Sequence, residues 1–313
     1  MRPSLITFTQ RGIEQIRKHG LRLLWYRYVQ RARILRTRPT PCPDDAEIEL
    51  HTLVCKRDWL NGVWSLKSFR VAAGAPFRLI VHSDGSLLPK QLASLLHHFP
   101  GALFATREAT HADLGRIAAD CPRLISIWEQ GRYPGLSRIV DAVSLSRRPT
   151  YFSVDPDVLF FDRPHEMLQR SAEQDTLFGG FNVERTKENN DGLYCVDEKA
   201  LLAKFGIRLP TGFNFGLGWM HREKFDWCLL NEILTTVPFD DSYFFVLDQT
   251  LAAIMCAVKG YVRLPVDRYV VEPVESLRQV AVRHYYARTR DLLYSEGIAT
   301  LLKRGFLRTV DGL

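Results

Sequence analysis

Short apolar runs alternate with helix-patterned segments in the first half of the chain, and this alternation constrains the fold more than any other feature. Residues 48–55 and 76–82 have strand patterns, and residues 58–72 between them have the length of a crossover helix. A helix pattern at 88–98 and a strand at 102–105 continue the series. Such alternation predicts an α/β, Rossmann-like fold, in which a mostly parallel mixed sheet carries helices on both faces.

The second half of the chain is less regular but extends the same sheet. We expect one folded domain over residues 46–313, with no internal repeat and no second domain. The further elements expected are strands at 150–154, 176–182, 213–220 and 261–264 and helices near 112–119, 135–147, 222–235 and 243–257.

The basic character of the chain lies in an N-terminal extension, residues 1–45. Residues 1–40 carry +9, against +7 for the whole chain, so the folded body is slightly acidic and no nucleic-acid partner is expected. Residues 11–36 have the pattern of a basic amphipathic helix, and three prolines at 39, 41 and 43 then mark a linker.

This helix pattern fits two arrangements equally well. A basic amphipathic helix can lie on an anionic membrane, where each Lys or Arg contributes about 1 kcal/mol, or it can pack on the domain with its arginines in solvent. The chain has no continuous apolar segment of a signal peptide or membrane span, and its six cysteines include no CxxC pair. We therefore expect a cytoplasmic protein whose membrane contact, if residues 11–36 make one, is peripheral and on the inner face.

An acidic pair, Asp155-Pro156-Asp157, follows the strand at 150–154 directly. Ligands of open α/β sheets bind outside the carboxyl ends of the strands, where this pair lies. Two carboxylates that flank a proline can approach one hard cation, and Mg²⁺ or Mn²⁺ takes such oxygen ligands together with a substrate diphosphate. The alternative is an ordinary solvated turn.

Residues 151–164 around this pair resemble the DxD segment of GT-A glycosyltransferases of the glycogenin-like superfamily, which use UDP- or GDP-sugars with Mn²⁺ or Mg²⁺. The resemblance implies that Asp155 and Asp157 bind the metal and that Asp155 also contacts the donor. Residues 134–141 are similar to the preceding helix of these enzymes, which implies that Arg138 lies near the diphosphate. By the same resemblance, Thr52, Val54 and Asp84 belong to the two strand ends that hold the nucleobase and ribose.

Three later segments follow in the order of the same family. Residues 212–218 look like the FNxG segment, which implies that Asn214 lines the donor-sugar and acceptor pocket, and Asp248 stands in a segment like the family's DQ pair. Asp248 would orient sugar hydroxyls or accept the acceptor's proton, with Asp240 and Asp241 as further candidate bases. An Asp in the first turn of a helix also has a purely structural explanation. His284 would be the third metal ligand, although the residues that follow it depart from the glycogenin-like pattern.

The expected function is metal-dependent transfer of a sugar, as by a hexosyltransferase, from a nucleotide-diphosphate donor to a hydroxyl of a glycan, lipid-linked saccharide or glycolipid. One alternative is a nucleotidylyltransferase, although residues 55–58 after the first strand have the bases of such an enzyme's loop without its glycines. The other alternative is a basic membrane-associated interaction protein that acts through residues 1–40.

Overall fold

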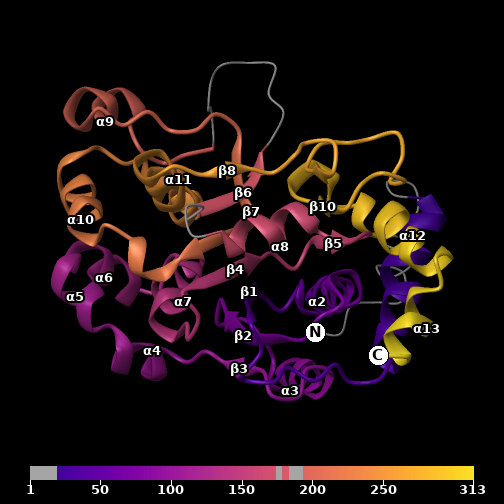
Figure 1. Cartoon of the computed structure of the whole chain (residues 1–313). Coiled ribbons are helices and arrows are strands. Elements are labelled where there is room, and N and C mark those ends of the chain that lie inside the picture. Colours follow the sequence, from indigo (N-terminus) through magenta and orange to yellow (C-terminus); the bar gives the residue numbers. More distant parts are fainter. Residues whose placement is uncertain (1–19, 174–177, 183–192) are drawn as a thin grey trace, which may run out of the picture.

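A seven-stranded sheet with helices on both faces forms the centre of the molecule, as a computed structural model shows (Figure 1). The structure describes residues 20–173, 178–182 and 193–313. Along the central strand β4 (Thr150–Val154), Phe152 and Val154 pack into one hydrophobic core, while Tyr151 packs into the other. Side chains alternate between the faces of a strand, so the two cores lie on opposite faces of the sheet.

The strand order is β3-β2-β1-β4-β7-β6-β8, and most neighbours are parallel. Strand β7, which is antiparallel to both β4 and β6, makes the sheet mixed. The expected α/β fold class is therefore confirmed. The remaining strands of this sheet are β1 (Ile48–Val54), β2 (Phe77–Ser83), β3 (Leu103–Phe104), β6 (Phe178–Asn182), β7 (Phe213–His221) and β8 (Val262–Arg263).

A second, three-stranded sheet with the order β5-β10-β9 was not predicted from the sequence. It consists of β5 (Val158–Phe160), β10 (Val282–His284) and β9 (Tyr269–Val270). These strands are too short to show the alternating pattern that identifies a strand. Their pairing nevertheless matters for function, because β5 begins immediately after the acidic pair.

Most of the expected helices are present, but several are divided. The helix expected at 135–147 consists of the 3₁₀ helix η3 (Pro134–Arg138) and α7 (Val140–Leu145), and the one expected at 243–257 consists of η5 (Asp241–Val246) and α11 (Leu247–Lys259). The first crossover helix and its successors are α2 (Trp59–Ala73), α3 (Pro89–His98), α4 (Arg107–Asp113), α5 (Gly115–Asp120) and α10 (Trp227–Thr236). The helices of the described residues that the sequence did not predict are α6 (Pro122–Glu129), α8 (His165–Ala172), α9 (Glu198–Phe205), η6 (Ala287–Thr289), η7 (Leu293–Ile298), α12 (Ala299–Lys303) and α13 (Phe306–Asp311).

The described part of the N-terminal extension packs on the domain. Residues 20–36 are helical and include a π-helical turn, η1 (Trp25–Gln30), and a 3₁₀ turn, η2 (Arg31–Arg36). They lie at one edge of the molecule beside the C-terminal helices (Figure 1), and Leu23 and Ile34 enter the same core as α2. The first half of the amphipathic pattern, before residue 20, falls outside the described residues, and the domain boundary near residue 45 stays a prediction. Within the described ranges, no helix is both long enough and apolar enough to cross a membrane.

A buried polar network crosses β1 and β2. His51 Nδ1 lies 2.9 Å from His82 Nε2, and His51 Nε2 lies 3.1 Å from Glu49 Oε1 and 3.2 Å from Ser146 Oγ. Arg78 Nη1 donates to Glu49 Oε2 at 2.5 Å. Because His51 is fully buried, desolvation lowers its pKa to about 4. The imidazole is therefore neutral at pH 7, and the network depends on its staying neutral.

Acidification should destabilise the protein through His51. The unfolded chain binds this proton near pH 6.5, whereas the folded chain resists it down to about pH 4, so the stabilisation is complete above pH 6.5 and is lost as the pH falls through this window. The free energy of unfolding should fall by roughly 2 kcal/mol from this residue between about pH 7 and about pH 4.5. Chemical denaturation of His51→Asn should show a pH dependence weaker by that amount, and the exposed-site control His97→Asn should not. An equal pH dependence in His51→Asn and wild type would contradict this assignment.

Candidate functional site

The strand pairing of β4 places the acidic pair at the sheet edge. The ladder between β4 and β7 continues one residue past the strand, where Asp155 N donates to Gly216 O at 2.8 Å. The chain then turns at Pro156, and Val158 N donates to Asp155 O at 3.1 Å. This turn leads the chain into β5 and keeps the carboxylates of Asp155 and Asp157 at the edge of the sheet.

The small sheet brings His284 to the same place. In the antiparallel pair of β5 and β10, His284 lies opposite Val158, and Tyr285 N donates to Asp157 O at 2.9 Å. His284 Nε2 consequently lies 3.1 Å from Asp157 Oδ1 and 3.7 Å from Asp155 Oδ2. One ligand atom from each of the three residues lies within 4.8 Å of the others. The three residues predicted as metal ligands are thus brought together from two distant segments of the chain.

Hydrogen bonds to Asn214 fix which nitrogen of His284 faces the acids. Asn214 Oδ1 accepts from Gly216 N at 3.0 Å, which identifies this atom as the oxygen, and it lies 2.8 Å from His284 Nδ1. Nδ1 must therefore carry a proton, and in a neutral ring Nε2 presents a lone pair to Asp157. A lone pair and a carboxylate oxygen 3.1 Å apart repel each other unless a proton or a metal ion lies between them.

Gly216 provides the space for the imidazole of His284. An ideal Cβ at position 216 would lie 2.2 Å from His284 Cε1 and 2.3 Å from Nδ1, so no larger residue fits without moving the ring. Phe181 stacks on the ring of His284, with centroids 5.8 Å apart. The orientation of the candidate ligand is therefore set by packing as well as by Asn214.

Arg138 links this cluster to Asp248. Its Nη1 donates to Asp155 Oδ1 at 2.5 Å, its Nε donates to Asp248 Oδ2 at 2.6 Å, and the guanidinium lies 4.8 Å from the ring centroid of Phe215. Gly135 permits the close approach of Asp248, because a Cβ there would lie 3.0 Å from its carboxyl carbon. Asp248 stands in the first turn of α11 but is buried in this ion pair, so it does more than balance the helix dipole.

The two aspartates differ in their affinity for protons. Burial raises the pKa of Asp155 to about 6, against the attraction of Arg138. Burial also disfavours the charge on Asp157, but His284 and then Arg290 outweigh it and lower the pKa of Asp157. Burial thus disfavours the negative charge of these carboxylates. A cation bound between them would favour the ionised form of both.

Arg290, in the segment after His284 where the sequence departs from the glycogenin-like pattern, is a further residue of this site, and the sequence analysis did not assign it. Its Nη2 pairs with Asp58 Oδ2 and lies 3.8 Å from Asp157 Oδ2. Asp58 is buried at the start of α2. The left-handed backbone of Ala287, with φ of 44°, begins the turn that returns Arg290 toward the acidic pair.

Two cavities open on either side of η3 and share Tyr133 and Pro134. The first, of about 330 Å³, is lined by Asp84, whose carboxylate also accepts hydrogen bonds from Ser86 in an ordinary turn. The second, of about 310 Å³, is lined by Asp241 and by Asp248. The first cavity is completed by Ser83, Gly85, Ala105, Trp128, Gly131, Ser137 and Asp141, and the second by Arg132, Gly135, Leu136, Ser242, Phe245 and Leu247.

Two other predicted residues lie deeper. Thr52 and Val54 are almost fully buried within β1, so their contact with a nucleotide stays a prediction. Gln249, beside Asp248, accepts from Phe215 N at 3.1 Å and donates to Leu193 O at 2.8 Å, and so holds β7 in place. Asp240 lies outside both cavities and accepts a hydrogen bond from Ser242 Oγ at 2.6 Å.

The residues present fit a divalent cation. Two carboxylates and an imidazole suit Mn²⁺ better than a purely oxygen site would, and Mg²⁺ remains compatible with the acids. His284 donates its other ring nitrogen to an amide oxygen, which is the usual second contact of a metal-binding histidine. The donor set, the fixed tautomer and the cradle at Gly216 all agree with a metal at this position.

The fold matches solved glycosyltransferases, whereas no protein-family model and no curated protein matches the sequence. A structure of galactosyltransferase LgtC with donor and acceptor sugar analogs has a TM-score of 0.50 at 12% identity, over 82% of this chain and 96% of that one. The bifunctional glycosyltransferase WbbM has a TM-score of 0.51 at 11% identity over 84% of this chain, which spans about half (52%) of WbbM. The chain therefore has a glycosyltransferase fold, as the resemblance to GT-A enzymes implied.

Replacement of Gly216 by Ala should disrupt the cluster of Asp155, Asp157 and His284 without unfolding the protein. The added methyl group displaces the ring of His284, so affinity for Mn²⁺ should fall by about tenfold to a hundredfold, as when a ligand loses its orienting contacts. Titration calorimetry with Mn²⁺ would measure this change, and a thermal melt would confirm folding. Gly312→Ala is the matched control, because a Cβ there meets nothing nearer than 3.6 Å. Wild-type Mn²⁺ affinity in Gly216→Ala would show that His284 is not a ligand.

Proposed function

We propose that this protein is a metal-dependent glycosyltransferase that moves a sugar from a nucleotide-diphosphate donor to a hydroxyl of a saccharide or glycolipid. One observation carries the proposal: Asp155, Asp157 and His284 converge at the carboxyl end of β4, with Nδ1 of His284 hydrogen-bonded to Asn214 and Nε2 directed at the acids. The fold, which is that of solved glycosyltransferases, supports the same chemistry.

The metal ligands proposed are Asp155, Asp157 and His284, and Asn214 is proposed to hold the histidine in its binding tautomer. A bound Mn²⁺ or Mg²⁺ supplies positive charge that stabilises a departing diphosphate. Asn214 thus acts by positioning His284 and does not itself contact the reacting groups.

Two arginines at the site are suited to bind the donor's phosphates. Arg138 lies between Asp155 and Asp248, and Arg290 lies between Asp58 and Asp157. A guanidinium donates several hydrogen bonds in one plane, which matches phosphate oxygens. Asp58 and Asp248 hold these groups in position before the donor binds, so less conformational freedom is lost on binding.

We assign the cavity beside β2 to the nucleoside and the cavity beside α11 to the sugars. Asp84 and the aromatic ring of Tyr133 offer a nucleoside a hydrogen-bond acceptor and a stacking surface. In the other cavity, Asp241 is exposed, whereas Asp248 is buried against Arg138. Asp241 is therefore the better candidate to take the acceptor's proton, and Asp248 the better candidate to orient the donor sugar through Arg138.

Loss of either acidic ligand should abolish donor cleavage. Asp155→Asn and Asp157→Asn should each lower Mn²⁺-dependent hydrolysis or transfer of a nucleotide sugar by at least about a hundredfold, because several kcal/mol of charge stabilisation disappear. A thermal-shift panel of UDP- and GDP-sugars with Mn²⁺ would first identify the donor. The matched control is Asp162→Asn, an exposed carboxylate that follows the same segment. Full activity in either ligand variant, or in EDTA, would overturn the metal-dependent mechanism.

Asp241→Asn should separate acceptor chemistry from donor binding. The side chain lines only the sugar cavity, so donor hydrolysis and donor affinity should persist while transfer to the acceptor falls by about a hundredfold or more. Product analysis under saturating donor would measure both rates. Asp240→Asn, at the adjacent exposed carboxylate, should leave both rates unchanged. A transfer rate in Asp241→Asn equal to wild type would remove this residue from the acceptor site.

A further inference from the structure

The N-terminal helix exposes a set of large apolar side chains on its outer face. We define this outer face by five residues: Leu21, Trp25, Tyr28, Val29 and Leu35, which are 68, 52, 61, 44 and 37% exposed. Scattered exposed apolar residues are ordinary, but several large ones together on one helix mark an interaction surface.

The opposite, inner face of the helix already has its partners within the domain. Leu23 and Ile34 are buried in the core, and Trp64 donates to Arg31 O at 2.9 Å. Arg31 Nη1 donates to Asn61 at 3.0 Å, and Arg27 pairs with Asp291 at 3.7 Å. Arg27 and Arg31 therefore fasten the helix to the domain. The outer face is not needed for this packing.

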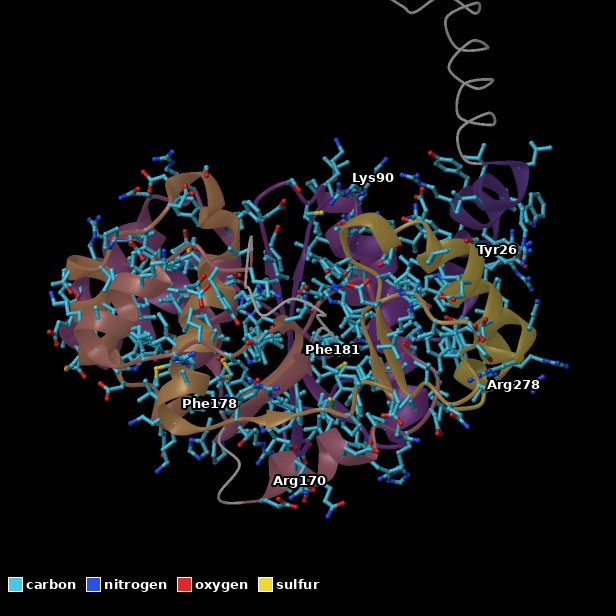
Figure 2. The ribbon with its side chains drawn as sticks, turned by 90° about the horizontal axis from the view of Figure 1, so that it is seen from above. Tyr26, Lys90, Arg170, Phe178, Phe181 and Arg278 are labelled. Carbon is cyan, nitrogen blue, oxygen red and sulfur yellow. The ribbon has the colours of Figure 1, made fainter. Side chains whose placement is uncertain are left out.

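Positive charge surrounds the outer face. Arg22, Arg33 and Arg36 are exposed on the same helix, and residues 1–40 together carry +9 in a chain whose remaining part is slightly acidic. Tyr26 and the helix that carries it lie at the periphery of the molecule, away from the sheet (Figure 2). The surface is thus apolar at its centre and basic around it.

We propose that the outer face docks on an anionic phospholipid surface, with the helix lying in the plane of the interface. Trp and Tyr are favoured at the boundary between headgroups and acyl chains, and flanking arginines pair with lipid phosphates. A second copy of the chain would bring two basic surfaces together, and a nucleic acid would leave Leu21 and Val29 without a partner. The lipid surface satisfies both the charge and the apolar area.

Docking there would hold the acidic cluster close to the membrane. The segment 290–294 contacts the N-terminal helix through Asp291 and Tyr294, and the first residue of the segment, Arg290, lies beside Asp157. The segment 290–294 therefore contacts both the lipid-docking helix and the acidic pair. The docking itself depends only on the helix, so it stands or fails independently of the transferase activity.

Vesicle flotation with the full-length protein would test the proposal. Wild type should bind vesicles of phosphatidylcholine with phosphatidylglycerol at least about tenfold more tightly than phosphatidylcholine alone, since each basic residue contributes about fivefold. Binding should weaken between about 0.1 M and about 1 M NaCl, across which the screening length falls from ~10 Å to ~3 Å. Trp25→Ser with Val29→Ser should lower the affinity by at least about tenfold, because both side chains would enter the interface.

The matched control is Leu202→Ser with Val266→Ser, two apolar residues of similar exposure on other parts of the surface, which should bind as wild type does. Thermal melts would confirm that both double variants fold. Equal binding of wild type and Trp25→Ser with Val29→Ser would overturn the proposal, and so would equal affinity for neutral and anionic vesicles. A concentration-dependent dimer that the Trp25 and Val29 substitutions dissociate, without vesicle binding, would assign the face to a second copy instead. Tight duplex DNA binding without vesicle binding would also refute it.

Discussion

Two carboxylates packed together in a largely buried site must be neutralised, and the arrangement around Asp155 and Asp157 follows from that requirement. The positive charge of Arg138 compensates Asp155 and that of Arg290 compensates Asp157. His284 lies close to both carboxylates. Uncompensated charges in a buried site would cost several kcal/mol each. The site is consequently stable as a charge cluster, and its donor set is one that a divalent cation can also satisfy.

Each compensating residue reaches the cluster through a different part of the fold. The 3₁₀ turn η3 carries Arg138, strand β10 of the small sheet carries His284, and the turn after β10 carries Arg290. Asp248 and Asp58, which are buried at the beginnings of α11 and α2, pair with these two arginines and hold them in position. The cluster therefore connects the two halves of the domain, and both halves must be folded for it to form.

The sequence could predict the parts of this arrangement that have a strong local pattern. Strand β4 and the acidic pair after it were expected where they are found, because an apolar run followed by Asp-Pro-Asp is readable without knowledge of the fold. Strand β10 has three residues and no periodicity, so its pairing with β5 could not be foreseen. His284 was expected from resemblance alone. The imidazole of His284 on β10 requires a glycine at position 216 on β7. This requirement follows only from the way the two strands pack in the folded chain.

The N-terminal helix shows a different limit of sequence reading. The sequence shows a single amphipathic pattern that fits membrane contact or packing on the domain equally well, whereas the structure divides the apolar residues between a core face and an exposed face. The π-helical and 3₁₀ turns at residues 25–36 alter the number of residues per turn, so an even period of 3.6 misplaces the side chains. Arg27 and Arg31 face inward because Asp291, Asn61 and Tyr294 attract them, a tertiary effect that local periodicity does not record.

The short turn η3 has more influence on the site than its five residues suggest. Tyr133 and Pro134 at its start line both cavities, Gly135 packs on Asp248, and Arg138 at its end pairs with Asp155. Pro134 restricts the backbone at the first position of the turn, where a proline costs no hydrogen bond. A displacement of this turn would change both cavities and the charge balance of the acidic pair together. The geometry of both cavities and of the acidic pair is therefore set by one short element.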